Sequence, residues 1–145
     1  MKPFSLETVL NYRQRLEDIA HNRFFKAQQN RAIVKQKLKQ EQIKLSQLIE
    51  KSVQLQAQGV TITELIRYET SILQNEENII AIKKNLDEKT NLMQNERENL
   101  IQKSRDRQIM ERLKEQQNQA WKEYLNKKEA AMLDEIAIIR HGGEN

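Results

Sequence analysis

The chain is divided near its middle by seven residues, Gly59-Val60-Thr61-Ile62-Thr63-Glu64-Leu65, and the sequence on either side reads as helix. Gly59 suits the left-handed position that ends many helices, where a side chain would clash. Thr61 can cap a second helix, and Glu64 is placed three residues later to reach back to the Thr61 amide. Val60 and Leu65 occupy the two positions of a hydrophobic staple, which fixes the direction in which the chain enters the helix. The stretch therefore predicts a tight reversal.

Composition favours long, solvated helices over a globular core. Of 145 residues, charged residues make up 32% and aromatic residues 5%, with 3 glycines and 1 proline. So few turn-forming residues leave little room for many short elements. We expect an all-α fold, in which two long helices form an antiparallel coiled-coil hairpin and the C-terminal helix overhangs the first. The expected organisation is a single domain over 1–145 with helix 5–58, turn 59–61, helix 62–140 and a flexible tail at 141–145.

The first expected helix carries a coiled-coil seam. From Leu6 to Leu55 a strict 4-3 spacing marks 15 positions, and 10 of them are apolar. Polar residues interrupt the seam at five of these positions: Arg13, Glu17, Arg31, Glu41 and Ser52.

The second expected helix repeats one aliphatic residue or methionine in every heptad, at Leu65, Ile72, Ile79, Leu86, Met93 and Leu100. We take the complementary positions to be polar: Glu69, Glu76, Lys83, Thr90, Arg97 and Ser104. A fold at residues 59–60 pairs residues whose numbers sum to about 120. This register places Leu10 near Ile109, and it places Arg13 opposite Asp106 or Arg107, where an ion pair can form.

Past about residue 115 the first helix has run out, yet the second continues with apolar residues on one side. Several are spaced by eleven, a repeat that keeps side chains on one face of a nearly straight helix. They are Met110, Trp121 and Met132, Leu113 and Tyr124, and Leu125 and Ile136, followed by Ile139. A stripe without an internal partner predicts a docking surface. A frayed terminus and a stripe closed by self-association are the alternatives.

Basic residues gather in the first helix, with seven between Arg23 and Lys44 and one acid, Glu41. One interpretation is binding to nucleic acid or to an anionic membrane, which would weaken steeply with salt. No known nucleic-acid-binding motif accompanies the run, so we expect no nucleic acid partner. We expect instead a solvated face beside a second helix that is mildly acidic, in a structural coiled coil.

Residues suited to catalysis are scarce. The two histidines, His21 and His141, lie far apart in the chain without acidic clusters at metal spacing. No phosphate-binding glycine loop, nucleophile elbow or cysteine is present. The sequence predicts no catalytic, cofactor-binding or metal-binding residues, and no enzyme. The start lacks the apolar run of a signal peptide, and the longest aliphatic runs are four residues, so we expect a soluble, cytoplasmic protein.

Three segments resemble those of a known family. They are Phe4-x-Leu6-x-x-Val9-Leu10-x-x-Arg13-x-x-x-Glu17-x-x-Ala20, Ser104-Arg105-Asp106-Arg107, and Leu133-Asp134-Glu135-Ile136-Ala137-x-x-Arg140. In order and separation they resemble the flagellar export protein family FliJ, as do the chain length and the central turn.

The resemblance implies a cytoplasmic, non-enzymatic stalk of the flagellar type III export apparatus. Its terminal end would insert into the hexameric export ATPase FliI, and it would contact the export gate protein FlhA and empty export chaperones at the inner membrane. An equivalent stalk of a virulence injectisome is the alternative. The residues expected at the ATPase-facing end, by position in the family motifs or in the apolar stripe, are Arg13, Arg105, Asp106, Arg107, Trp121, Tyr124, Leu125, Met132, Asp134, Glu135, Ile136 and Arg140.

Overall fold

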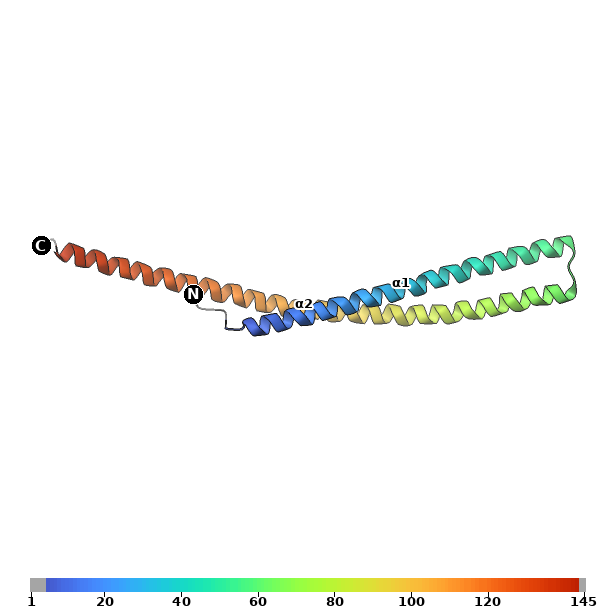
Figure 1. Cartoon of the computed structure of the whole chain (residues 1–145), viewed down its shortest axis with the longest axis horizontal. Helices are drawn as coiled ribbons and strands as arrows, with labels where there is room; N and C mark the ends of the chain where they lie inside the picture. Colours follow the sequence, from blue (N-terminus) through green and yellow to red (C-terminus); the bar gives the residue numbers. More distant parts are fainter. Residues whose placement is uncertain (1–4, 144–145) are drawn as a thin grey trace. The chain divides into compact units, whose positions relative to one another are not determined.

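The computed structural model describes residues 5–143, which contain two helices and no strand (Figure 1). Helix α1 runs over Glu7–Gln58 and helix α2 over Ile62–Gly143. The predicted all-α fold, with two long helices that pack against each other, is confirmed. Helix α2 ends three residues later than predicted, and Arg140 and His141 lie in its last turn, where basic side chains interact favourably with the helix dipole. Of the predicted tail, residues 144–145 lie outside the described part of the chain.

The turn between the helices forms as its residues predict. Gly59 has a φ of 92°, in the left-handed region that disfavours other residues, although a Cβ there would meet no atom within 4 Å. The requirement for glycine is therefore conformational and not steric. The Thr61 hydroxyl accepts a hydrogen bond of 3.2 Å from the backbone amide of Glu64, so Thr61 is the N-cap of α2.

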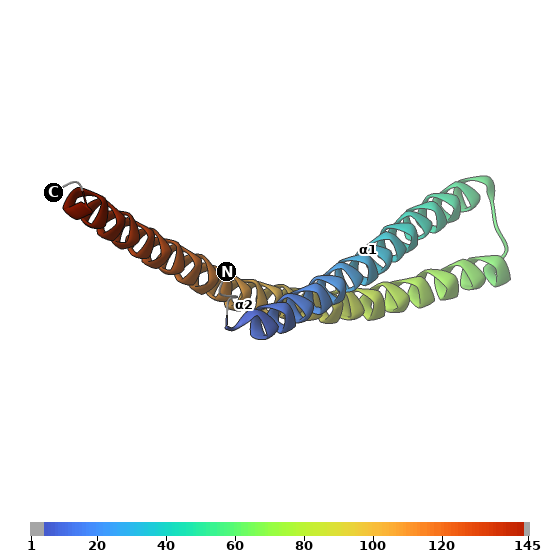
Figure 2. The ribbon, with the colours of Figure 1, turned by 60° about the vertical axis from the view of Figure 1, so that its left-hand side comes forward.

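The chain divides into two compact units, one of which covers Ala20–Leu100 while the other joins Met1–Ile19 to Ile101–Asn145. In each unit a stretch of α1 packs against a stretch of α2 that runs in the opposite direction, and Figure 2 shows the two helices spreading apart as they approach the turn.

In the unit over Ala20–Leu100, the core lies along the predicted seam of α1. Ala20, Ala27 and Val34 are buried there, and Ile79 and Ile82 are buried on α2. Every other predicted seam residue of α1 between Phe24 and Leu55 is buried or half-buried. The seven-residue repeat from Leu65 to Leu100 is likewise buried or half-buried throughout.

The second line of the α2 seam differs from the prediction by one residue in its first three heptads, whereas Thr90 and Ser104 are half-buried as the prediction requires. Glu69, Glu76 and Lys83 are exposed, and the residues before them, Tyr68, Asn75 and Ile82, are buried or half-buried. The line that turns inward buries Ile82 and half-buries Tyr68, whereas Glu69, Glu76 and Lys83 offer no large apolar side chain. Hydrophobic burial therefore decides between two lines that both contain polar residues.

Polar side chains cross this seam in matched pairs. The Asn75 amide donates a hydrogen bond of 2.7 Å to a carboxylate oxygen of Glu41. The Arg31 guanidinium donates one of 2.9 Å to the Thr90 hydroxyl. The residue numbers of each pair sum to about 120, as the predicted register requires.

The basic run of α1 is a largely solvated face. Arg31 is half-buried in the seam, while the six other basic residues between Arg23 and Lys44 are exposed. The three ion pairs of the described residues all lie in the other unit. The run is thus the solvated face that the sequence predicts.

Candidate functional site

All twelve residues predicted for partner binding belong to the unit formed by Met1–Ile19 and Ile101–Asn145. The unit has two parts. In the first, the start of α1 packs on α2. In the second, which we call the bare segment and define as residues 122–142 of α2, every residue is exposed.

The start of α1 is held on α2 by one apolar contact and several polar ones. Leu10 and Met110 form a buried cluster. The Lys114 ammonium lies 3.1 Å from the Glu7 carboxylate, near the beginning of α1. Ile109, predicted to lie near Leu10, is exposed, because the side chain that turns toward α1 is that of the next residue. Lys114 pairs with the beginning of α1, and the bare segment begins about two turns later along α2.

Arg13 makes a contact of a different kind from the one predicted. Its Nη1 donates a hydrogen bond of 2.9 Å to the backbone carbonyl of Asp106, so no ion pair joins the two side chains. The Asp106 carboxylate instead accepts a hydrogen bond of 3.2 Å from the Gln102 amide on its own helix. Arg13 thus ties α1 to the backbone of α2.

An ion pair between the two helices does form in this region, but it joins Arg107 to Glu17 and does not involve Arg13. The Arg107 guanidinium lies 2.7 Å from Glu17 of α1 and 2.7 Å from Glu111 of α2. These two carboxylates raise the pKa of Arg107 above its ordinary value, and the hydrogen bond that Arg107 donates to Glu17 is the main cause. The guanidinium of Arg107 therefore stays charged throughout the physiological range.

The charged residues of the first two family segments, Phe4–Ala20 and Ser104–Arg107, differ in what they contact. Arg13 and Arg107 are half-buried and face the other helix of their own chain, whereas Arg105 is exposed. The ion pairs Glu17–Arg107 and Glu7–Lys114 were not predicted. The sum rule of about 120 was the available signal, since it places Glu7 opposite Lys114.

The bare segment carries large apolar side chains that no other part of the described chain covers. Tyr124, Met132, Ile136 and Ile139 are between 45% and 71% exposed, and Leu125 is 41% exposed. Asp134, Glu135 and Arg140 are also exposed. Met110, which we predicted as the first member of this stripe, is only 3% exposed and belongs to the core with Leu10.

An aromatic pair lies where the bare segment begins. The rings of Trp121 and Tyr124 stack with centroids 5.3 Å apart and planes 23° apart. Trp121 is half-buried, whereas Tyr124 is exposed. Because the residues are one turn apart on the same helix, stacking fixes both rings on one side of α2.

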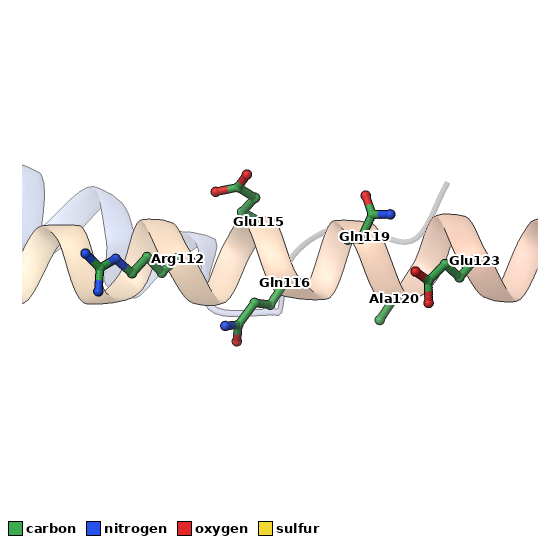
Figure 3. Close-up of a pocket in the computed structure, with 6 residues that line it drawn as sticks. All are labelled: Arg112, Glu115, Gln116, Gln119, Ala120 and Glu123. Carbon is green, nitrogen blue, oxygen red and sulfur yellow. The ribbon is translucent and has the colours of Figure 1, made fainter.

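The arrangement is suited to binding a macromolecule and offers no enclosed cleft. Figure 3 shows a depression on α2 lined by Arg112, Glu115, Gln116, Gln119, Ala120 and Glu123, whose side chains point to different sides of a single helix. The described residues contain no group of three or more His, Asp or Glu side chains able to hold a metal ion. No helix among them is both long and apolar enough to cross a membrane.

Comparisons with known proteins agree with this description. The fold is similar to that of a YscO homologue from Chlamydia trachomatis, with a TM-score of 0.73, 15% sequence identity, and coverage of 97% of this chain and 96% of that chain. No curated protein matches the chain. The fold and the uncovered end of α2 thus define a coiled-coil protein made of two long helices.

The particular family follows from the sequence itself. The family described as flagellar FliJ protein matches residues 1–145, and the chain belongs to that family. The protein is accordingly a component of type III protein export.

Proposed function

We propose that this protein is the cytoplasmic, non-enzymatic stalk that docks its bare segment in the hexameric export ATPase FliI. Through the rest of the chain it links the ATPase to the export gate protein FlhA and to export chaperones at the cytoplasmic face of the inner membrane. The observation that carries the proposal is the bare segment itself, a helical end whose aliphatic side chains are exposed in the described chain.

Spacing along the helix supports docking through one face. Leu125, Met132, Ile136 and Ile139 follow one another by seven, four and three residues, which puts them on the same side of an α-helix. An amphipathic helix laid in an apolar groove uses anchors at such intervals. Each aliphatic anchor that becomes covered contributes roughly 1.5–3 kcal/mol before the costs of binding are subtracted.

The width of the segment supports a ring as the partner. A single α-helix with its side chains is about 10–12 Å across, so it can enter a channel that excludes a pair of helices. The exposed charges of Asp134, Glu135 and Arg140 would then meet polar groups at the wall of the channel and set the rotation of the helix about its axis. Arg105, also exposed, is the remaining charged candidate nearer to the helix pair. Arg13, Asp106 and Arg107 support docking indirectly, since they fix α1 at the base of the segment.

The test is ATP hydrolysis by the cognate export ATPase with the full chain and with a chain truncated after residue 121. We expect the full chain to raise the rate and the truncated chain to lose that effect and its binding to the ring. The double variant Met132→Gln and Ile136→Gln should behave like the truncation. A matched control, Asn126→Ala with Lys127→Ala, changes the opposite side of the same segment and should stimulate normally. Full stimulation by the truncated chain would refute the proposal.

A second candidate is the equivalent stalk of a virulence secretion system, which the fold shared with the YscO homologue favours. The two candidates differ in the ATPase that responds. Stimulation of an injectisome ATPase, with no effect on the flagellar enzyme of the same cell, would select the second.

A further inference from the structure

Two polar layers cross the seam in the unit over Ala20–Leu100, and they differ in how well their hydrogen-bonding groups are satisfied. In the first layer, the Thr90 hydroxyl accepts a hydrogen bond from Arg31 and donates one of 2.8 Å to the Leu86 carbonyl. Arg31 and Thr90 are both half-buried, so they also keep contact with solvent. This layer therefore leaves little polar surface without a partner.

The second layer, formed by Glu41 and Asn75, lies nearer the turn and is less well satisfied. Asn75 is 3% exposed. Its amide nitrogen donates to Glu41, but its buried carbonyl oxygen accepts no hydrogen bond from any residue in the described part of the chain. Burying an acceptor without a partner costs free energy, because the acceptor has given up its hydrogen bonds to water. That cost is recovered when the helices separate at this level and water reaches the amide.

Apolar packing differs on the two sides of the Glu41–Asn75 layer. Between the layer and the turn lie residues 42–58 and 62–74, which we call the turn-side arms. The only fully buried side chain in these arms, which the structure describes throughout, is that of Ser52, and its hydroxyl accepts a hydrogen bond from Gln56 of its own helix. The apolar seam residues of the arms are all half-buried: Leu45, Leu48, Leu55, Leu65, Tyr68 and Ile72. On the other side of the layer, fully buried apolar residues are present: Ala20, Ala27, Val34, Ile79 and Ile82.

Polar contacts show the same asymmetry. Within residues 42–74, all of them described, no hydrogen bond or ion pair joins α1 to α2. The two helices also spread apart as they approach the turn (Figure 2). Short helices with little buried surface are only marginally stable, and such regions open locally at low cost in free energy. The turn-side arms therefore gain little from staying paired.

The layer also marks where separation should end. Separation that begins at the turn and reaches Asn75 hydrates the buried carbonyl oxygen. One step further it would expose Ile79 and Ile82 of α2 and Val34 of α1, which are at most 9% exposed in the paired state. Exposing such side chains to water is unfavourable in proportion to their apolar area.

We propose that the Glu41–Asn75 layer is a joint built into the helix pair. The turn-side arms separate and close again as one unit, and the separation ends at this layer. Residues 20–40 and 76–100 stay paired while the arms move. The joint is a property of the isolated chain, so it stands or falls independently of docking in the ATPase.

The first test is amide hydrogen exchange of the full chain, followed by mass spectrometry. We expect peptides within 42–74 to exchange at least about tenfold faster than peptides within 20–40 and 76–100. The double variant Glu41→Leu with Asn75→Leu replaces the layer by an apolar pair. It should slow exchange in the arms by roughly tenfold or more, because separation then exposes two leucines and no longer hydrates a buried amide.

The control is Gln40→Leu with Asn78→Leu, which introduces the same two leucines at exposed positions close to the layer. It repeats the change from Asn to Leu, so it matches the test variant in helix propensity. We expect it to leave exchange in the arms unchanged. Circular dichroism should show that both variants remain helical.

A second measurement follows the arms directly. The chain has no cysteine, so spin labels can be attached to pairs of introduced cysteines. Lys51→Cys with Ser71→Cys reports on the arms, and Lys37→Cys with Asn85→Cys reports on the paired part; all four positions are exposed. We expect a broad distance distribution with a long component for the first pair and a narrow one for the second. Adding Glu41→Leu and Asn75→Leu should narrow the first distribution and leave the second as it was.

Several results would overturn the proposal. Equal exchange on both sides of the layer would show that the arms do not open as a separate unit. Slower exchange in the control variant, to the same degree as in the test variant, would show that the layer has no special part in the opening. Narrow distributions for both label pairs in the otherwise unchanged chain, or faster exchange in the arms after Glu41→Leu with Asn75→Leu, would also contradict it.

Discussion

The part of α2 within Ala20–Leu100 and the bare segment of the same helix carry similar residues in different surroundings. In the first, Ile79 is 7% exposed because α1 lies over it, whereas Ile136 in the bare segment is 45% exposed. Both stretches are helical and carry apolar side chains at helical spacing, repeated every seven residues in the first and every eleven in the second. A repeating apolar face therefore specifies an amphipathic helix. Whether another helix packs on that face decides if it becomes core or an exposed docking surface.

The largest effect should come from truncating the same residue type in both places. Ile79→Ala removes buried methyl groups and leaves a cavity, so it should lower the free energy of unfolding by about 2–4 kcal/mol. Ile136→Ala should change it by less than about 0.5 kcal/mol, because the side chain already meets solvent. Urea unfolding followed by circular dichroism measures both. Similar losses in the two variants would mean that the bare segment is covered in solution.

A second matched pair compares two methionines of one unit. Met110 is 3% exposed and packs on Leu10, whereas Met132 is 55% exposed. We expect Met110→Ala to cost about 2 kcal/mol and to free the start of α1, which would show as faster amide hydrogen exchange in that stretch. Met132→Ala should leave exchange in α1 unchanged. Equal protection in both variants would place the end of the pairing elsewhere.

The turn brings the first part of α2 against α1, and loss of the Thr61 N-cap there should lower the free energy of unfolding. Thr61→Ala removes the hydroxyl that accepts the Glu64 amide and should lower the unfolding free energy by about 1 kcal/mol. Thr63→Ala, two residues later in an exposed position, is the control and should have little effect. Thermal melting distinguishes the two, and a smaller loss in Thr61→Ala than in the control would contradict the assignment of the cap.

The smallest effect concerns the bridge that holds the two helices together above the bare segment. Glu17→Gln removes the partner of Arg107 on α1 and should cost about 0.5–1 kcal/mol, since the two side chains are 19% and 21% exposed. Glu111→Gln removes a partner on the same helix, whose side chain is 50% exposed, and should cost less. Repeating the urea titration in 1 M salt should shrink the difference between these variants, because screening weakens exposed charges most. A larger loss in Glu111→Gln would reverse the order of importance.

Much of the fold could be predicted because its signals are local. The cap and the left-handed glycine act within a few residues, and the seven-residue repeat of α1 identifies one face of a single helix. The second line of the α2 seam could not be predicted in the same way. Tyr68 and Asn75 have polar residues on both sides and Ile82 follows Ile80 and Ala81, so only packing against α1 shows which line turns inward.

The candidate site likewise has features that local sequence predicts and features that only packing decides. The apolar stripe of the bare segment was predictable, since α2 is longer than α1 and its apolar residues keep their spacing past the end of the pairing. The roles of the charged residues were not. Arg105 and Arg107 are two residues apart in one motif, yet one is exposed and the other bridges two carboxylates.

The residues alone settle that there are two helices, where the chain reverses, and which face of each helix is apolar, because caps, turns and periodicity involve neighbours within a turn or two. The assembled structure decides that Met110 is core, that Arg13 binds a backbone carbonyl and that Arg107 bridges Glu17 and Glu111. Apart from the bridge to Glu111, these contacts join residues 90 or more positions apart. Their geometry depends on how one helix is rotated against the other, a quantity that no local pattern encodes.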